Sequence, residues 1–175
     1  MNDILAAIQT RRSIRKFKSD IPNKRDIEQI IEAGRYAASG KGQQATMTIA
    51  VTNQELRNRI SADNLKIGGW GKDFDPFYGA PVILIVLADK NQATYLYDGS
   101  LVLGNMMLAA HSLGLGSIWI HRAKEEFEMP MYQDLLKKLH IEGKWEGIGH
   151  CAIGYIDGTI PNPAKRAEER IFWIE

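Results

Sequence analysis

Residues 81–87 read Pro81-Val82-Ile83-Leu84-Ile85-Val86-Leu87, a proline followed by six consecutive apolar residues. A short apolar run of this kind is typical of a β-strand that is buried on both faces. Such a strand needs helices above and below its sheet, because each face must be covered by another layer. The stretch therefore predicts a central strand between two helical layers.

Helix and strand patterns alternate on both sides of this run. Apolar spacing predicts helices over residues 3–10, 24–38, 95–113 and 130–139, and Thr52-Asn53-Gln54-Glu55 predicts the start of another. Strand composition is found over residues 46–52, 117–120, 147–155 and 171–174. The order predicts an α+β fold with a central mixed or antiparallel sheet flanked by helices.

The 95–113 helix is apolar around nearly its whole circumference, with Leu101, Val102, Leu103, Met106, Met107 and Leu108 in one turn after another. A helix of this kind is either central to a domain or shared with a partner subunit. In a chain of 175 residues we consider a partner at least as reasonable as a core.

Length and composition bound the class of protein. A chain of 175 residues predicts one domain, 1–175, and its 22 basic and 21 acidic side chains give little support for nucleic-acid or membrane-surface binding. Cys151 is the only cysteine, which excludes an intrachain disulfide framework and favours a reducing compartment. Without a signal-peptide pattern or an apolar run of about 18 residues, we expect a cytoplasmic protein.

Positive charge is concentrated near the N-terminus, in the basic residues Arg11, Arg12, Arg15, Lys16 and Lys18. Guanidinium groups bind phosphate oxygens bidentately, and the Ser13 hydroxyl adds a further donor. Taken alone, a basic run is more often a solvated surface. A second basic cluster near the C-terminus, Lys165, Arg166 and Arg170, favours convergence of the two on one phosphate.

Several other chemistries lack their residue patterns. The four histidines, at 111, 121, 140 and 150, have no metal-site spacing, and Cys151 lies in an apolar strand where an inert thiol is expected. Neither Gly-x-Ser-x-Gly nor a complete nucleotide-binding glycine motif occurs. We therefore expect no metal and no catalytic side chain, and favour a flat phosphorylated redox cofactor that carries the chemistry.

The chain resembles the FMN-dependent nitroreductase family in its compact bacterial or archaeal form. The matching segments occur in family order over nearly the whole chain: Arg11-Arg12-Ser13-Ile14-Arg15-Lys16-Phe17, Ala38-Ser39-Gly40-Lys41-Gly42-Gln43-Gln44, Phe77-Tyr78-Gly79-Ala80-Pro81, Asp98 with residues 105–110, residues 114–120, and Gly154-Tyr155 with Pro163, Arg166 and Arg170. The resemblance implies an intertwined homodimer with two FMN sites at the subunit interface.

The resemblance also implies which residues bind FMN. Phosphate, ribityl and pyrimidine contacts fall on Arg11, Arg12, Ser13 and Arg15, with Lys165 and Arg166 closing on the phosphate. Ser39, Gly40 and Gln44 form a second binding segment, in which Gln44 faces FMN from the other subunit. The backbone of Ile118, Trp119 and Ile120 lies along the isoalloxazine ring.

Two positions depart from the family pattern. Gly42 stands where the family usually has asparagine, and Ala45 stands where it usually has proline. Losing the asparagine amide removes a hydrogen bond to the flavin worth about 1 kcal/mol.

The function implied is an FMN-dependent NAD(P)H oxidoreductase with tightly bound FMN, acting by ping-pong hydride transfer through flavin N5. NAD(P)H is the co-substrate, and a nitroaromatic or quinone is the small-molecule acceptor. The alternatives are a flavin storage or sensor protein without turnover, or a relative with another flavin chemistry. Segment 64–80 is either a flap over the ligand or a packed surface loop.

Overall fold

β2 (Val82–Asp89) lies inside a four-stranded sheet, with β1 (Thr46–Val51) on one side and β4 (Trp145–Gly154) on the other, in the computed structural model, which describes residues 2–175. β3 (Gly116–Ile120) follows β4 and completes the order β1-β2-β4-β3. All three strand pairs are antiparallel. The expected α+β fold is confirmed, and of the two expected kinds of sheet the antiparallel one is present.

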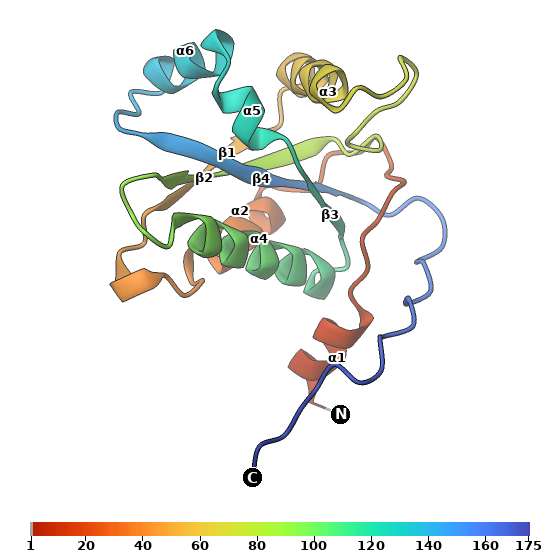
Figure 1. Cartoon of the computed structure of the whole chain (residues 1–175). Helices are drawn as coiled ribbons and strands as arrows, with labels where there is room; N and C mark the ends of the chain where they lie inside the picture. Colours follow the sequence, from red (N-terminus) through yellow and green to blue (C-terminus); the bar gives the residue numbers. More distant parts are fainter. Residues whose placement is uncertain (1) are drawn as a thin grey trace.

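Helices cover both faces of this sheet (Figure 1). One layer holds α3 (Gln54–Gly68), α5 (Ala123–Phe127) and α6 (Pro130–Lys138). The other holds α2 (Lys24–Arg35) and α4 (Tyr95–Ser112), while α1 (Asp3–Thr10) lies at the end of α4. A short 3₁₀ turn, η1 (Gly40–Gly42), precedes β1.

The alternation of side chains along β2 divides the interior into two hydrophobic cores. Ile83, Ile85 and Leu87 pack with Ile60 of α3 and Phe127 of α5. Val82, Leu84, Val86 and Ala88 pack instead with residues of α2 and α4, among them Ile30, Leu103 and Met106. Because successive strand residues point to opposite faces, an uninterrupted apolar strand is the sequence that two helical layers require.

Asparagine side chains begin three of the helices. Asn2, Asn23 and Asn53 each accept hydrogen bonds from backbone N–H groups of the first turn of α1, α2 and α3. These contacts satisfy N–H groups that have no partner within a helix. The start expected from residues 52–55 is therefore confirmed, with Asn53 rather than Thr52 as the capping residue.

α4 is buried on one side only. Leu103 and Met106 are fully buried, whereas Tyr97 is 72% exposed and Leu101 49% exposed. Half of the apolar circumference seen in the sequence is thus core, and the other half faces outward in this protomer.

The expected strand over residues 171–174 is wrong for the structure of this chain. After β4 the chain continues as an irregular tail, in which Phe172 and Trp173 are each 84% exposed (Figure 1). A strand needs a neighbouring strand for its hydrogen bonds, and the tail lies beside none in this chain. α5 was not expected, because five residues are too few to show a helical apolar period.

Within residues 2–175, every helix is too short or too polar to span a lipid bilayer.

Candidate functional site

The basic N-terminal segment lies along the edge of the sheet, against β3. Ser13 forms a bridge with Ser117, where the Ile14 N–H donates to the Ser117 carbonyl at 3.0 Å. Ile14 and Phe17 are buried in the core, so they fix the segment while Arg15 remains exposed. The two apolar residues within the basic run, Ile14 and Phe17, thus anchor this segment at the edge of the sheet.

Two guanidinium nitrogens of this segment are buried without a partner. Arg12 Nη1 donates to the carbonyls of Gln9 and Arg11, at 2.7 Å each. Arg12 Nε and Arg11 Nη1 are buried and meet no acceptor among residues 2–175. Leaving a charged donor buried and unpaired is costly, so this position is suited to an anionic ligand.

His111, on the last turn of α4, lies next to this segment. Its Nε2 is 2.9 Å from the Thr10 hydroxyl, which donates its own proton to the Ala6 carbonyl at 2.7 Å. The hydroxyl therefore accepts from His111, which places the ring proton on Nε2. Burial lowers the pKa of His111, and the charges of Arg11 and Arg12 lower it further. Sequence reasoning missed this contact, because residues 10 and 111 meet only in the folded chain.

The three β3 residues expected at the flavin lie on an edge strand. One side of β3 pairs with β4, and only its first residues meet the Ser13 segment on the other side. Ile118 and Ile120 are nearly buried and belong to one core, whereas Trp119 packs against the other. An edge strand leaves backbone groups available to a ligand.

The second expected binding segment, residues 39–44, lies at the opposite end of α4. The Gly40 N–H donates to Asp98 Oδ1 at 3.0 Å, and the Gln44 N–H donates to Ser39 Oγ at 3.0 Å. Asp98 and His111 are thirteen residues apart on α4, roughly 20 Å at the helical rise. The structure therefore does not bring Ser39, Gly40 and Gln44 to the arginine cluster within one protomer.

The backbone of η1 explains why a glycine is tolerated at position 42. Gly42 has φ +65°, and a Cβ built there would meet no atom within 4 Å. Left-handed backbone favours glycine and, after it, asparagine. The exchange between these two residue types fits the backbone, whatever its effect on ligand binding.

Lys165 and Arg166 are exposed in the C-terminal tail, where Lys165 pairs with Glu168 at 2.8 Å. A groove of about 330 Å³ lies between the start of that tail and the basic segment, lined by Arg15, Lys16, Asp157 and Thr159 among others. The Lys16 and Asp157 side chains form an ion pair of 2.8 Å at this groove. The tail thus leaves the sheet beside the basic segment, before it reaches the two expected phosphate residues.

Segment 64–80 is a helix end followed by a packed loop. Asp75 accepts from Arg57, from the Ser61 hydroxyl at 2.6 Å, and from the N–H groups of Phe77 and Gly79. Phe77 is fully buried, whereas Trp70 is 42% exposed. The second half of the loop is therefore fixed by these hydrogen bonds. Phe74 makes edge-to-face contacts with both Trp70 and Tyr78.

Cys151 is fully buried on β4, and burial raises its pKa to about 12. A thiol in this state is a poor nucleophile, in agreement with the inert cysteine expected from the sequence. In the part of the chain that the structure describes, histidine, cysteine and carboxylate side chains do not gather in threes at a metal-binding distance.

The family model described as "Nitroreductase family" matches residues 8–68 and 69–155. The chain belongs to the nitroreductase family. Over 121 residues it is 36% identical to a putative NADH dehydrogenase/NAD(P)H nitroreductase of Methanothermobacter thermautotrophicus, a match of 67% of this chain and 60% of that protein. A protein of the same description from Archaeoglobus fulgidus is 30% identical over 78% of this chain and 77% of its own length.

Solved nitroreductase structures have the same fold. A Bacteroides fragilis nitroreductase with bound FMN superposes with a TM-score of 0.88 at 28% identity, covering 100% of both chains. A Desulfitobacterium hafniense nitroreductase with bound FMN gives 0.87 at 27% identity, again over 100% of both chains. Both matches thus cover the whole length of this chain.

Proposed function

We propose that this protein is an FMN-dependent NAD(P)H oxidoreductase in one domain, 1–175, that reduces electron-poor acceptors such as nitroaromatics and quinones. The observation that carries the proposal is the pair of buried, unpartnered guanidinium nitrogens on Arg11 and Arg12 beside edge strand β3. Family members with this fold contain FMN, whose phosphate supplies the missing acceptor. Relatives named "FMN reductase [NAD(P)H]" (Bacillus subtilis, 29% identical) and "NADPH-flavin oxidoreductase" (Vibrio harveyi, 31% identical) agree with the reaction class.

The residues of this chain supply binding and charge. Bound FMN would supply the hydride-transfer chemistry between NAD(P)H and the acceptor, so no side chain need act as nucleophile. Arg11 and Arg12 hold the phosphate, Ser13 contacts the ribityl chain, and Arg15 neutralises negative charge that develops at the pyrimidine edge. The backbone of Ile118, Trp119 and Ile120 forms the wall along the ring.

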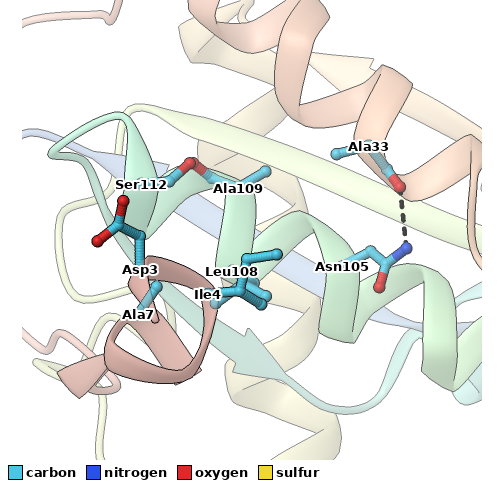
Figure 2. Close-up of a pocket in the computed structure, with 8 residues that line it drawn as sticks. All are labelled: Asp3, Ile4, Ala7, Ala33, Asn105, Leu108, Ala109 and Ser112. Atoms are coloured by element: carbon cyan, nitrogen blue, oxygen red, sulfur yellow. Dashed lines mark hydrogen bonds between the residues drawn. The ribbon is translucent and has the colours of Figure 1, made fainter. Parts of the chain in front are cut away.

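The complete site requires a second copy of the chain. Residues 39–44 lie at the far end of α4 from the arginine cluster, so they reach a flavin only in the partner subunit. α4 presents an apolar face for such a partner, next to a groove of about 440 Å³ that Ile4 and Ala7 of α1 line with Asn105, Leu108 and Ala109 of α4 (Figure 2). In this intertwined homodimer the exposed tail crosses over, which brings Lys165 and Arg166 to a phosphate.

An absorbance spectrum of the purified protein tests the proposal, followed by anaerobic addition of NADH and then NADPH. We expect flavin bands that either nucleotide bleaches, and turnover with menadione or a nitroaromatic. Bound flavin that neither nucleotide bleaches would favour a storage or sensor protein. Protein that lacks flavin and takes up no added FMN would refute the proposal.

Replacing Arg15 with alanine tests the charge assigned to it. We expect Arg15→Ala to lower the flavin potential or to weaken FMN binding, since a positive charge near the ring favours its reduced form. A variant unchanged in both properties would remove Arg15 from the site.

A further inference from the structure

A fully buried pair of ionisable residues lies at the end of β3, and the proposed chemistry does not use it. His150 on β4 and Glu126 on α5 both have 0% exposed side chains, and His150 Nε2 is 2.7 Å from Glu126 Oε2. His150 Nδ1 faces the carbonyl oxygen of Ile120 at 3.2 Å. Both ring nitrogens therefore meet oxygen atoms.

The hydrogen-bond partners determine how many protons the His150–Glu126 pair carries. A carbonyl oxygen can only accept, so Nδ1 carries a proton. The 2.7 Å contact between Nε2 and the carboxylate needs a second proton, on either atom. The pair thus holds two protons, one on Nδ1 and one shared between Nε2 and the carboxylate, and is neutral overall, which suits a dry interior.

Asn64 of α3 extends this network from Ile120 to His121, the residue that follows it. Its Nδ2 donates to Glu126 Oε1 at 2.7 Å and to the His121 carbonyl at 2.8 Å. Its Oδ1 is buried without a donor among residues 2–175, an arrangement that stability alone does not favour. Two successive carbonyls, of Ile120 and His121, are therefore held by buried side chains.

The residue that follows has strained backbone. Arg122 has φ 81°, a left-handed conformation that is uncommon for residues other than glycine. Such strain persists only where the surroundings determine the backbone, and it is concentrated at functional sites. The two held carbonyls immediately before Arg122 supply that constraint.

The geometry points to a positioning role: the Asn64–Glu126–His150 network fixes the backbone at the end of β3, and thereby the wall against which the flavin ring lies. The flavin part of this inference rests on the proposed function, whereas the constraint on the backbone does not. The three side chains act through the carbonyls of Ile120 and His121 and need not touch the cofactor.

Amide hydrogen exchange of the protein without flavin tests the constraint alone. The double variant Glu126→Leu/His150→Phe replaces the pair with apolar side chains, so no charge is left buried. We expect the amides of residues 118–123 to exchange at least about tenfold faster, with little change elsewhere in the sheet. Asn64→Ala, which removes the donor to the His121 carbonyl and to Glu126 Oε1 but keeps the His150 contact with the Ile120 carbonyl, should accelerate exchange at residues 121–123 by a smaller factor.

The conservative variant Glu126→Gln separates hydrogen bonding from charge. Its amide can donate to His150 Nε2 and accept from Asn64, so every contact of the network can be kept. We expect wild-type exchange at residues 118–123 in this variant. The control is Glu146→Gln, a second buried carboxylate, which lies near the start of β4 and contacts Lys90, Tyr95 and Lys124 rather than the carbonyls of Ile120 and His121.

The flavin-loaded protein then shows whether the constraint matters for the cofactor. In the double variant and in Asn64→Ala we expect a shifted flavin reduction potential and FMN affinity weakened by about tenfold, with both restored in Glu126→Gln. Wild-type exchange in Asn64→Ala, or faster exchange in Glu126→Gln, would overturn the backbone constraint. Faster exchange with an unchanged potential and affinity would leave the network a purely structural one, and wild-type protein that binds no FMN would refute the proposed function instead.

Discussion

Arg11 and Arg12, near the edge of the sheet, each bury one guanidinium nitrogen. Neither nitrogen has an acceptor among the described residues, whereas the nearby Arg15 side chain is exposed to solvent. Burial of such groups is disfavoured unless a ligand completes them. The ordinary basic run of the sequence is thereby distinguished from a solvated surface.

The phosphate contact of Arg11 can be isolated with two flavins. Arg11→Ala should weaken FMN binding by about 10- to 100-fold, because a hydrogen bond to a charged group contributes about 1.5–3 kcal/mol. Riboflavin, which lacks the phosphate, should bind wild type and variant alike in a fluorescence titration. The control is Arg35→Ala, an exposed arginine on α2. Equal losses for both flavins would place Arg11 away from the phosphate.

The pH dependence of stability near His111 follows from its neighbours. Burial, then Arg11 and Arg12, lower the pKa of His111 from 6.5, so the unfolded chain binds this proton more tightly than the folded one. Stability should therefore fall as the pH drops below about 6.5 and level off below the folded pKa. Thermal melts between about pH 5 and pH 7 should show a smaller decrease for His111→Gln. Bound FMN should reduce the wild-type decrease, since its phosphate favours the charged ring; an identical decrease in wild type and variant would contradict the assignment.

At the scale of elements, the loop between α3 and β2 depends on one carboxylate. Burial alone raises the pKa of Asp75, but hydrogen bonds from Arg57, Ser61 and the N–H groups of Phe77 and Gly79 outweigh it, so the pKa is lowered. Arg57 is itself buried, and its Nε donates to the Ala80 carbonyl at 2.9 Å. The loop is thus tied to α3 at both its middle and its end.

Removing this carboxylate should loosen the loop and destabilise the fold. Asp75→Ala leaves the Arg57 guanidinium buried without its partner, which costs about 3 kcal/mol. Urea unfolding would measure this loss, with the exposed Asp73→Ala as a control in the same loop. In wild type the stabilisation from Asp75 should be present above about pH 4 and disappear as the pH falls through the lowered folded pKa. A loss below about 0.5 kcal/mol would show that the loop does not depend on this contact.

At the scale of the whole molecule, the proposed homodimer accounts for exposed apolar side chains. Tyr97 and Leu101 on α4, with Phe172 and Trp173 in the tail, are all about half exposed or more. Large apolar side chains left exposed in this number are typical of an interface. Because the two expected cofactor-binding segments lie at opposite ends of α4, one partner in the proposed dimer would both cover these side chains and complete the site.

The tail provides a direct test of the homodimer. Phe172→Glu/Trp173→Glu should weaken association by at least about 100-fold, because each buried aromatic side chain contributes about 1.5–3 kcal/mol. Light scattering coupled to size exclusion should give twice 19.7 kDa for wild type and a concentration-dependent lower mass for the variant. FMN should be lost together with the dimer. Monomeric wild-type protein that still binds FMN would refute the shared site.

Local patterns were sufficient for most of the fold. The apolar run before Leu87 specified a strand buried on both faces, and asparagine caps with periodic apolar residues specified the long helices. Such features depend on residues close together in the chain, so the sequence alone determined them. The basic segment is different: taken alone it fits a solvated surface, and the anion site stays a prediction that also depends on the family resemblance.

Long-range contacts decided the rest. Thr10 meets His111, and Glu126 shares a proton with His150, although the members of each pair are far apart in the sequence. Asp75 likewise accepts hydrogen bonds from Arg57 and Ser61 of α3. Each depends on a few side chains that leave no periodic signal, and five-residue α5 leaves none either. The tail shows the converse: residues 171–174 have strand composition but lie outside any sheet of this chain, because a strand forms only where another strand offers its edge. The sequence by itself therefore determined most of the elements and the charge of the candidate site, because these depend on neighbouring residues, whereas tertiary structure decided which residues meet.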